Sequence, residues 1–132
     1  MVNLRETEIR EESLALVVET YRVANLITDS SRQLLRTNLV DSAFLVSSTI
    51  AKAFIALQDE DFETGIAQSL TGIDTIMEYL HEIESESLVD IIEVQSLRSI
   101  LDSEQQELQQ VLAASQISNS YAFSPKLERA CI

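Results

Sequence analysis

Glu78 and His81, in the run Glu78-Tyr79-Leu80-His81, are the residues whose types and spacing come closest to a metal site. A glutamate followed three residues later by a histidine presents two ligands from consecutive helical turns, as in di-iron bundle proteins. Such a site needs this motif twice and two further glutamates, and the sequence has a single histidine. We therefore expect no metal site and no cofactor, and we interpret both side chains as part of a solvated helix face.

Nucleophilic catalysis has no better support in the sequence. Cys131 is the only cysteine, and no second element is predicted that could hold a base beside it. The serines do not occur in a G-x-S-x-G sequence, and no phosphate-binding or dinucleotide-binding glycine motif is present. The sequence therefore predicts a protein that is not an enzyme.

The elements that would position any site are indicated by apolar residues recurring at steps of three and four. Four such stripes predict helices over about residues 5–26, 31–58, 62–83 and 88–114. The clearest stripe consists of Leu35, Leu39, Ala43, Val46, Ile50, Ala53 and Leu57. Polar residues that can cap helices separate the four segments, at 28–30, 59–61 and 84–87. We predict an all-α fold, an antiparallel up-down four-helix bundle over residues 1–114.

Glycine and proline add detail to this prediction. The chain has two glycines and one proline, too few for the many turns of a β-fold. Gly65 and Gly72 fall inside the third helix, which indicates close packing there, since each disfavours a helix by about 1 kcal/mol relative to alanine. Pro125 lies in residues 115–132, where the apolar pattern ends. We predict a tail there, either mobile or docked on this protein's neighbour or on another protein, because proline disfavours a continuous helix.

Some apolar residues do not fit the core stripes. In the second helix Phe44, Leu45, Phe54 and Ile55 lie off the main stripe, and one core cannot cover them all. Leftover apolar surface of this kind marks an interface. We therefore predict that these four residues take part in self-association. In the fourth helix, the stripe is interrupted between Leu101 and Leu108 by residues 103–105, where we expect looser packing or access for water.

The net charge of −13 is concentrated in one part of the chain. Residues 59–107 hold 14 acids and one base, and the other 83 residues carry eight of each sign. Nucleic-acid binding depends on Lys and Arg, so this surface disfavours a nucleic-acid partner. It is a solubilising face or a docking surface for a basic protein. The residues that we predict for partner binding are Glu78, Glu82, Glu86, Asp90 and Glu93.

The location follows from the N-terminus and from the apolar runs. The segment MVNLRETEIREE is rich in charged residues and lacks the apolar core of a signal peptide. The longest apolar runs are shorter than the roughly 20 residues that span a bilayer. We expect a cytoplasmic protein with no membrane partner.

The run LRTNLVDSAFLVSSTIAKAF, residues 35–54, resembles a known pattern without a gap. The four-helix-bundle proteins encoded in intervening sequences of bacterial 23S ribosomal RNA carry L-x-x-Q-I-R-R-A-A-x-S-I-P-x-N-I-A-E-G-F at this place. ALVVETYR, residues 15–22, is similar to the family's first helix, and FETGIAQSLTGIDTIMEYL, residues 62–80, to its third. The resemblance covers about residues 10–114.

The family includes accessory proteins of diversity-generating retroelements, which form homopentamers and bind a reverse transcriptase and its RNA through basic surfaces. The resemblance therefore implies a bundle that assembles as a homopentamer and has no catalytic residues. This chain departs from the pattern where the family has paired arginines, which fall on Val40 and Asp41.

The family's proline falls on Ser47, its asparagine on Thr49, its acidic residue on Lys52 and its glycine on Ala53. The apolar scaffold is kept and the basic surface is lost. We therefore predict a self-associating adaptor or regulatory protein that binds a basic protein partner. The alternative is an accessory factor acting with a reverse transcriptase and RNA.

Overall fold

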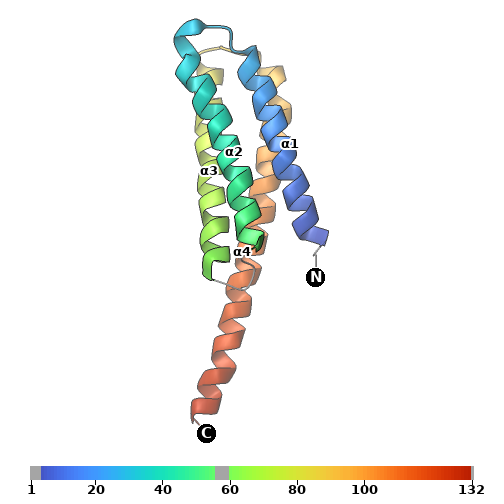
Figure 1. The fold of residues 1–132 in the computed structure, drawn as a ribbon, viewed down its shortest axis with the longest axis vertical. Coiled ribbons are helices and arrows are strands. Elements are labelled where there is room, and N and C mark those ends of the chain that lie inside the picture. Colours follow the sequence, from blue (N-terminus) through green and yellow to red (C-terminus); the bar gives the residue numbers. More distant parts are fainter. Residues whose placement is uncertain (1–3, 56–59, 132) are drawn as a thin grey trace.

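The computed structural model describes residues 4–55 and 60–131, which form four long helices (Figure 1). They are α1 (Leu4–Leu26), α2 (Gln33–Ile55), α3 (Glu60–Ser85) and α4 (Ile91–Cys131), and a short 3-10 helix, η1 (Ser30–Arg32), precedes α2. The described residues contain no strand. Both α1 and α3 pack against α2 and α4. The predicted all-α four-helix bundle is confirmed, and its neighbouring helices run antiparallel (Figure 1).

The core consists of the stripes that the sequence indicates. The stripe that begins at Leu35 is buried in α2, and each of its described members is at most 6% exposed. Leu57 lies outside the described residues. In α3 and α4 the same spacing buries Ile66, Ile73 and Leu80 on one helix and Leu97 and Leu101 on the other. Burial of these side chains holds the helices together, since removing apolar surface from water is the main favourable term in folding.

Gly65 and Gly72 bring α3 close to α2, as predicted. A Cβ atom at Gly65 would lie 2.8 Å from the Cβ of Ala53 and 3.3 Å from its Cα. A Cβ atom at Gly72 would lie 2.6 Å from a methyl group of Val46. The absence of a side chain at Gly65 therefore lets the backbones of the two helices approach closely, and Gly72 makes room for the side chain of Val46.

The corners between helices use caps that the sequence only partly indicates. The carboxylate of Asp29 accepts hydrogen bonds from the backbone N–H of Ser31 at 2.9 Å and from its hydroxyl at 2.7 Å. These hydrogen bonds lower the pKa of Asp29. The third corner continues further than the predicted 84–87. Ser87 has the left-handed φ of 53°, and Asp90 caps α4 by accepting from the N–H of Ile92 at 3.1 Å. Asp59 of the second corner lies outside the described residues.

The prediction that helix 4 ends near residue 114 is wrong. α4 continues to Cys131 and projects beyond the other three helices (Figure 1). Pro125 lies inside this helix. A proline disfavours a helix interior by about 3 kcal/mol because one N–H donor is lost and the ring crowds the preceding turn. This penalty applies at Pro125 alone, and the residues before and after it remain helical.

The stretch Ser30–Ile55 is long and apolar enough, by length and composition alone, to cross a membrane. It is the one such stretch in the described ranges 4–55 and 60–131. The central helix of a water-soluble bundle passes the same test. Here the apolar stripe of α2 packs against α1 and α3.

Candidate functional site

Most of the acids predicted to bind a partner are already engaged within the chain. Arg32 of η1 donates to Glu82, and to Glu86 at 3.0 Å, both from α3 and the corner after it. Arg22 of α1 donates to Glu93 of α4 at 2.7 Å. Partner binding by these acids stays a prediction, and arginines from distant parts of the sequence already reach three of the five.

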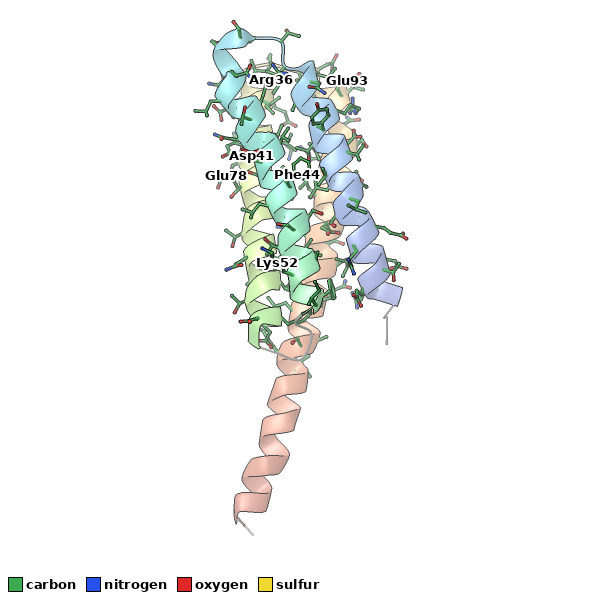
Figure 2. The ribbon with its side chains drawn as sticks, in the orientation of Figure 1. Arg36, Asp41, Phe44, Lys52, Glu78 and Glu93 are labelled. Atoms are coloured by element: carbon green, nitrogen blue, oxygen red, sulfur yellow. The ribbon has the colours of Figure 1, made fainter. Side chains whose placement is uncertain are left out.

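The other two acids differ from each other. Asp90 caps the first turn of α4 through the hydrogen bond to Ile92 described above. Glu78 is exposed on α3, and Figure 2 shows it projecting from the side of the bundle. Of the five predicted partner-binding residues, Glu78 is the one for which the structure gives no hydrogen bond or ion pair. His81 is also exposed, so the Glu78–His81 pair lies on a solvated face.

Three of the four residues predicted for self-association are exposed. The exposed fractions are 56% for Phe44, 63% for Leu45 and 82% for Ile55. Phe54 is only 7% exposed, and its ring packs edge-on against Phe62 with centroids 5.6 Å apart. The prediction for Phe54 is therefore corrected, because α3 covers this side chain within the same chain.

Most of the exposed large apolar residues belong to α1 and α2, and three others, Ile91, Ile92 and Ile117, belong to α4. We define the α1/α2 apolar face as the exposed large apolar side chains of these two helices, which are Leu14, Val18, Tyr21, Leu26, Leu34, Phe44, Leu45 and Ile55. The described side chains of α3 include no exposed large apolar residue. In Figure 2 Asp41, Phe44 and Lys52 follow one another along α2. Between α1 and α2 lies a hollow of about 240 Å³, lined by Tyr21, Val40, Arg36 and Asp41 among others.

A second candidate site lies at the seam between α1 and α4. Glu104 occupies a core-facing position of α4, three residues after Leu101 and four before Leu108. Its side chain is fully buried, and neither carboxylate oxygen has a hydrogen-bond partner. Glu12 of α1 and Glu107 of α4 contribute the other carboxylates, and the three groups offer oxygen atoms that all lie within 4.8 Å of one another. We call these three residues the carboxylate cluster.

The electrostatics of the carboxylate cluster are unfavourable for three negative charges. Burial, together with the nearby charges of Glu12 and Glu107, raises the pKa of Glu104 to about 9. Burial also raises the pKa of Glu12, and the charge of Glu107 adds to this effect. The hydroxyl of Ser103 donates to Glu107 at 3.3 Å. The ion pairs in the described part of the chain include none with a member of the cluster.

The sequence contained a signal for this cluster. Residues 103–105 interrupt the apolar stripe of α4, and looser packing or access for water was expected there. Instead, the helix keeps its contact with α1, and Glu104 is fully buried. The interruption of the α4 stripe at residues 103–105 therefore marks the buried carboxyl group of Glu104. Glu12 could not be identified from the sequence, because only the packing of α1 on α4 brings it to Glu104.

Comparison of the chain with protein family models, with curated proteins and with solved structures finds no match.

Proposed function

We propose that this protein is a non-enzymatic, cytoplasmic adaptor that self-associates through the α1/α2 apolar face and binds a basic protein partner. The resemblance described above favours a homopentamer. The observation that carries the proposal is the exposure of Phe44, Leu45, Leu14 and Val18 on two neighbouring helices. Large apolar side chains left exposed on neighbouring helices are typical of interfaces.

The charges of the bundle favour a second copy of the chain as the occupant of this face. α2 carries two basic residues and one acid, whereas α3 carries seven acids and no lysine or arginine. Two copies that met through α3 would bring like charges together. On the α1/α2 side this repulsion is small, and the apolar side chains can be buried against a second copy.

The acidic side of the bundle is proposed as the surface for a basic partner. Glu78 supports this proposal best because it is exposed and has no ion pair in the structure. The ion pairs of Arg32 and Arg22 lower the effective charge that Glu82, Glu86 and Glu93 can offer. Binding on this side would therefore centre on α3 and would weaken as the salt concentration rises.

Replacing Phe44 with aspartate is expected to abolish self-association. A charge in the centre of a contact between copies would have to be buried without a partner, which is strongly unfavourable. Light scattering after size exclusion should give a mass near five times 14.8 kDa for the wild type and near 14.8 kDa for the variant.

Ile92→Asp is the matched control, because Ile92 is 69% exposed but lies on α4. It introduces the same charge outside the α1/α2 apolar face and should leave the mass unchanged. A wild type that remains at 14.8 kDa at micromolar concentration would contradict the proposal. Equal effects of the two substitutions would show that the face is not specific.

The accessory-factor alternative differs in its affinity for RNA. In a gel-shift experiment at low salt, the adaptor proposed here should not retard a structured RNA. The physical reason is the negative charge of α3, which repels phosphate. A clear shift that disappears as salt is added would favour the alternative.

A further inference from the structure

The carboxylate cluster leaves four oxygen atoms without a hydrogen bond. They are one oxygen of Glu12, both oxygens of Glu104 and one oxygen of Glu107. Buried polar atoms are almost always paired, so such a group calls for a physical explanation. One proton shared between two carboxylates would pair two of the four atoms. A cation at the centre could contact all three side chains at once.

We propose that Glu12, Glu104 and Glu107 together bind one hard divalent cation at the seam between α1 and α4. The ligands are all carboxylate oxygens, which Ca²⁺, Mg²⁺ and Mn²⁺ prefer, whereas Zn²⁺ and Cu²⁺ favour histidine and cysteine. The oxygens lie within 4.8 Å of one another. Two ligands on opposite sides of a Ca²⁺ ion are separated by about 4.6–5.2 Å, twice the usual Ca–O distance, so the separations in the cluster do not exceed what one such ion can bridge.

The cluster borders a surface hollow, although its four unpaired oxygen atoms are themselves buried. A hollow of about 430 Å³ lies over it, lined by Glu8, Glu11, Glu12, Ala15 and Glu107. Its four carboxylates would attract a cation toward Glu104, which lies beneath them. The hollow also leaves room for water to complete the six to eight ligands that Ca²⁺ takes.

Occupation of the site would join two helices that are far apart in the sequence. Glu12 belongs to the first half of α1, and Glu104 and Glu107 belong to α4. The one ion pair that the structure gives between these helices, Arg22–Glu93, lies near the other end of α1. A bound cation would therefore stabilise the folded chain by fastening the N-terminal half of α1. This inference does not depend on the proposed self-association.

The test uses purified full-length protein treated with a chelator and then titrated with CaCl₂, MgCl₂ or MnCl₂ in buffer at physiological ionic strength. Calorimetry should show saturable binding of one ion per chain. The unfolding temperature should rise with the concentration of the cation that binds.

Glu107→Gln is the informative variant because Glu107 is only partly buried, so the substitution keeps the core intact. It should weaken cation binding by about tenfold or more, since affinity depends on the number of charged ligands. Glu104→Gln should have the same effect. The matched control is Glu78→Gln, which removes one exposed carboxylate on α3 and should leave the affinity within about twofold of the wild type.

Three results would overturn the proposal. One is no saturable binding up to about 10 mM, beyond the weakest range of protein Ca²⁺ sites. Another is binding that Glu107→Gln and Glu104→Gln leave unchanged. The last is an equal loss in Glu78→Gln, which would assign the effect to the general negative charge. None of these results bears on self-association, which is measured by the mass of the wild type and of Phe44→Asp.

Discussion

Glu104→Leu is expected to raise the free energy of unfolding by about 2 kcal/mol at pH 7 in the presence of a chelator. Glu104 places an ionisable group in a packed layer between Leu101 and Leu108, without a hydrogen-bond partner. Leucine has a similar length and continues the apolar stripe, so the desolvation penalty is removed and no large cavity is created. Urea denaturation followed by circular dichroism measures the difference.

The same residue should make the wild type less stable as the pH rises. The folded chain holds a proton on Glu104 up to a pKa of about 9, whereas the unfolded chain loses it near the ordinary value of 4.5. Between these values the folded state binds more protons than the unfolded state. The contribution of Glu104 to the free energy of unfolding is therefore fully present below pH 4.5 and is lost as the pH rises toward 9. The slope should approach about 1.4 kcal/mol per pH unit, the value for one proton.

Glu104→Gln and Glu104→Leu should both flatten this pH dependence, because neither side chain titrates. The raised pKa of Glu12 acts in the same direction, so a smaller slope should remain. The lowered pKa of Asp29 acts in the opposite direction and only at acidic pH, below its ordinary value of 3.8. Stability that rises between pH 5 and pH 9 in the wild type would contradict the burial of Glu104.

Gly65→Leu is expected to lower the free energy of unfolding by about 3 kcal/mol. The first atom of any side chain at this position would lie 2.8 Å from the Cβ of Ala53 and 3.3 Å from its Cα. The backbone of α2 cannot rotate away as a side chain could. The two helices would therefore have to separate, and the contacts on both sides of Gly65 would weaken. The gain in helix propensity, about 1 kcal/mol, is too small to offset this.

Ala67→Leu is the control for this substitution. Ala67 lies two residues further along α3 and is exposed, so the same side chain meets no neighbouring helix. Its stability should remain within about 0.5 kcal/mol of the wild type. If Gly65→Leu were as stable as Ala67→Leu, the close approach of α2 and α3 at Gly65 would be wrong.

The number of helices and their buried faces could be predicted because both follow from local spacing. The stripe from Leu35 to Ala53 is an example, since a helix places residues three and four apart on one side whatever surrounds it. The close packing at Gly65 and Gly72 was predictable for a similar reason. A glycine within a helix is unfavourable unless a neighbour requires the space.

The features that the sequence did not reveal depend on contacts between distant segments. Arg32 pairs with Glu82, fifty residues away, and Glu12 meets Glu104 across ninety-two residues. Phe54 was predicted to be exposed apolar surface, but Phe62 of α3 packs against it. In each case the polarity of the side chain is known from the residue type. Its environment, however, is set by the packing of one helix on another.

The unequal charge of α2 and α3 gives the molecule an electric dipole perpendicular to the long axis of the bundle. One flank is nearly neutral, and the other carries most of the negative charge. A cationic protein approaching from any direction would exert a torque on the bundle and turn α3 toward itself before the surfaces touch. Copies joined along the neutral flank would already point their charged flanks outward, so the assembled particle would meet such a protein without needing to reorient.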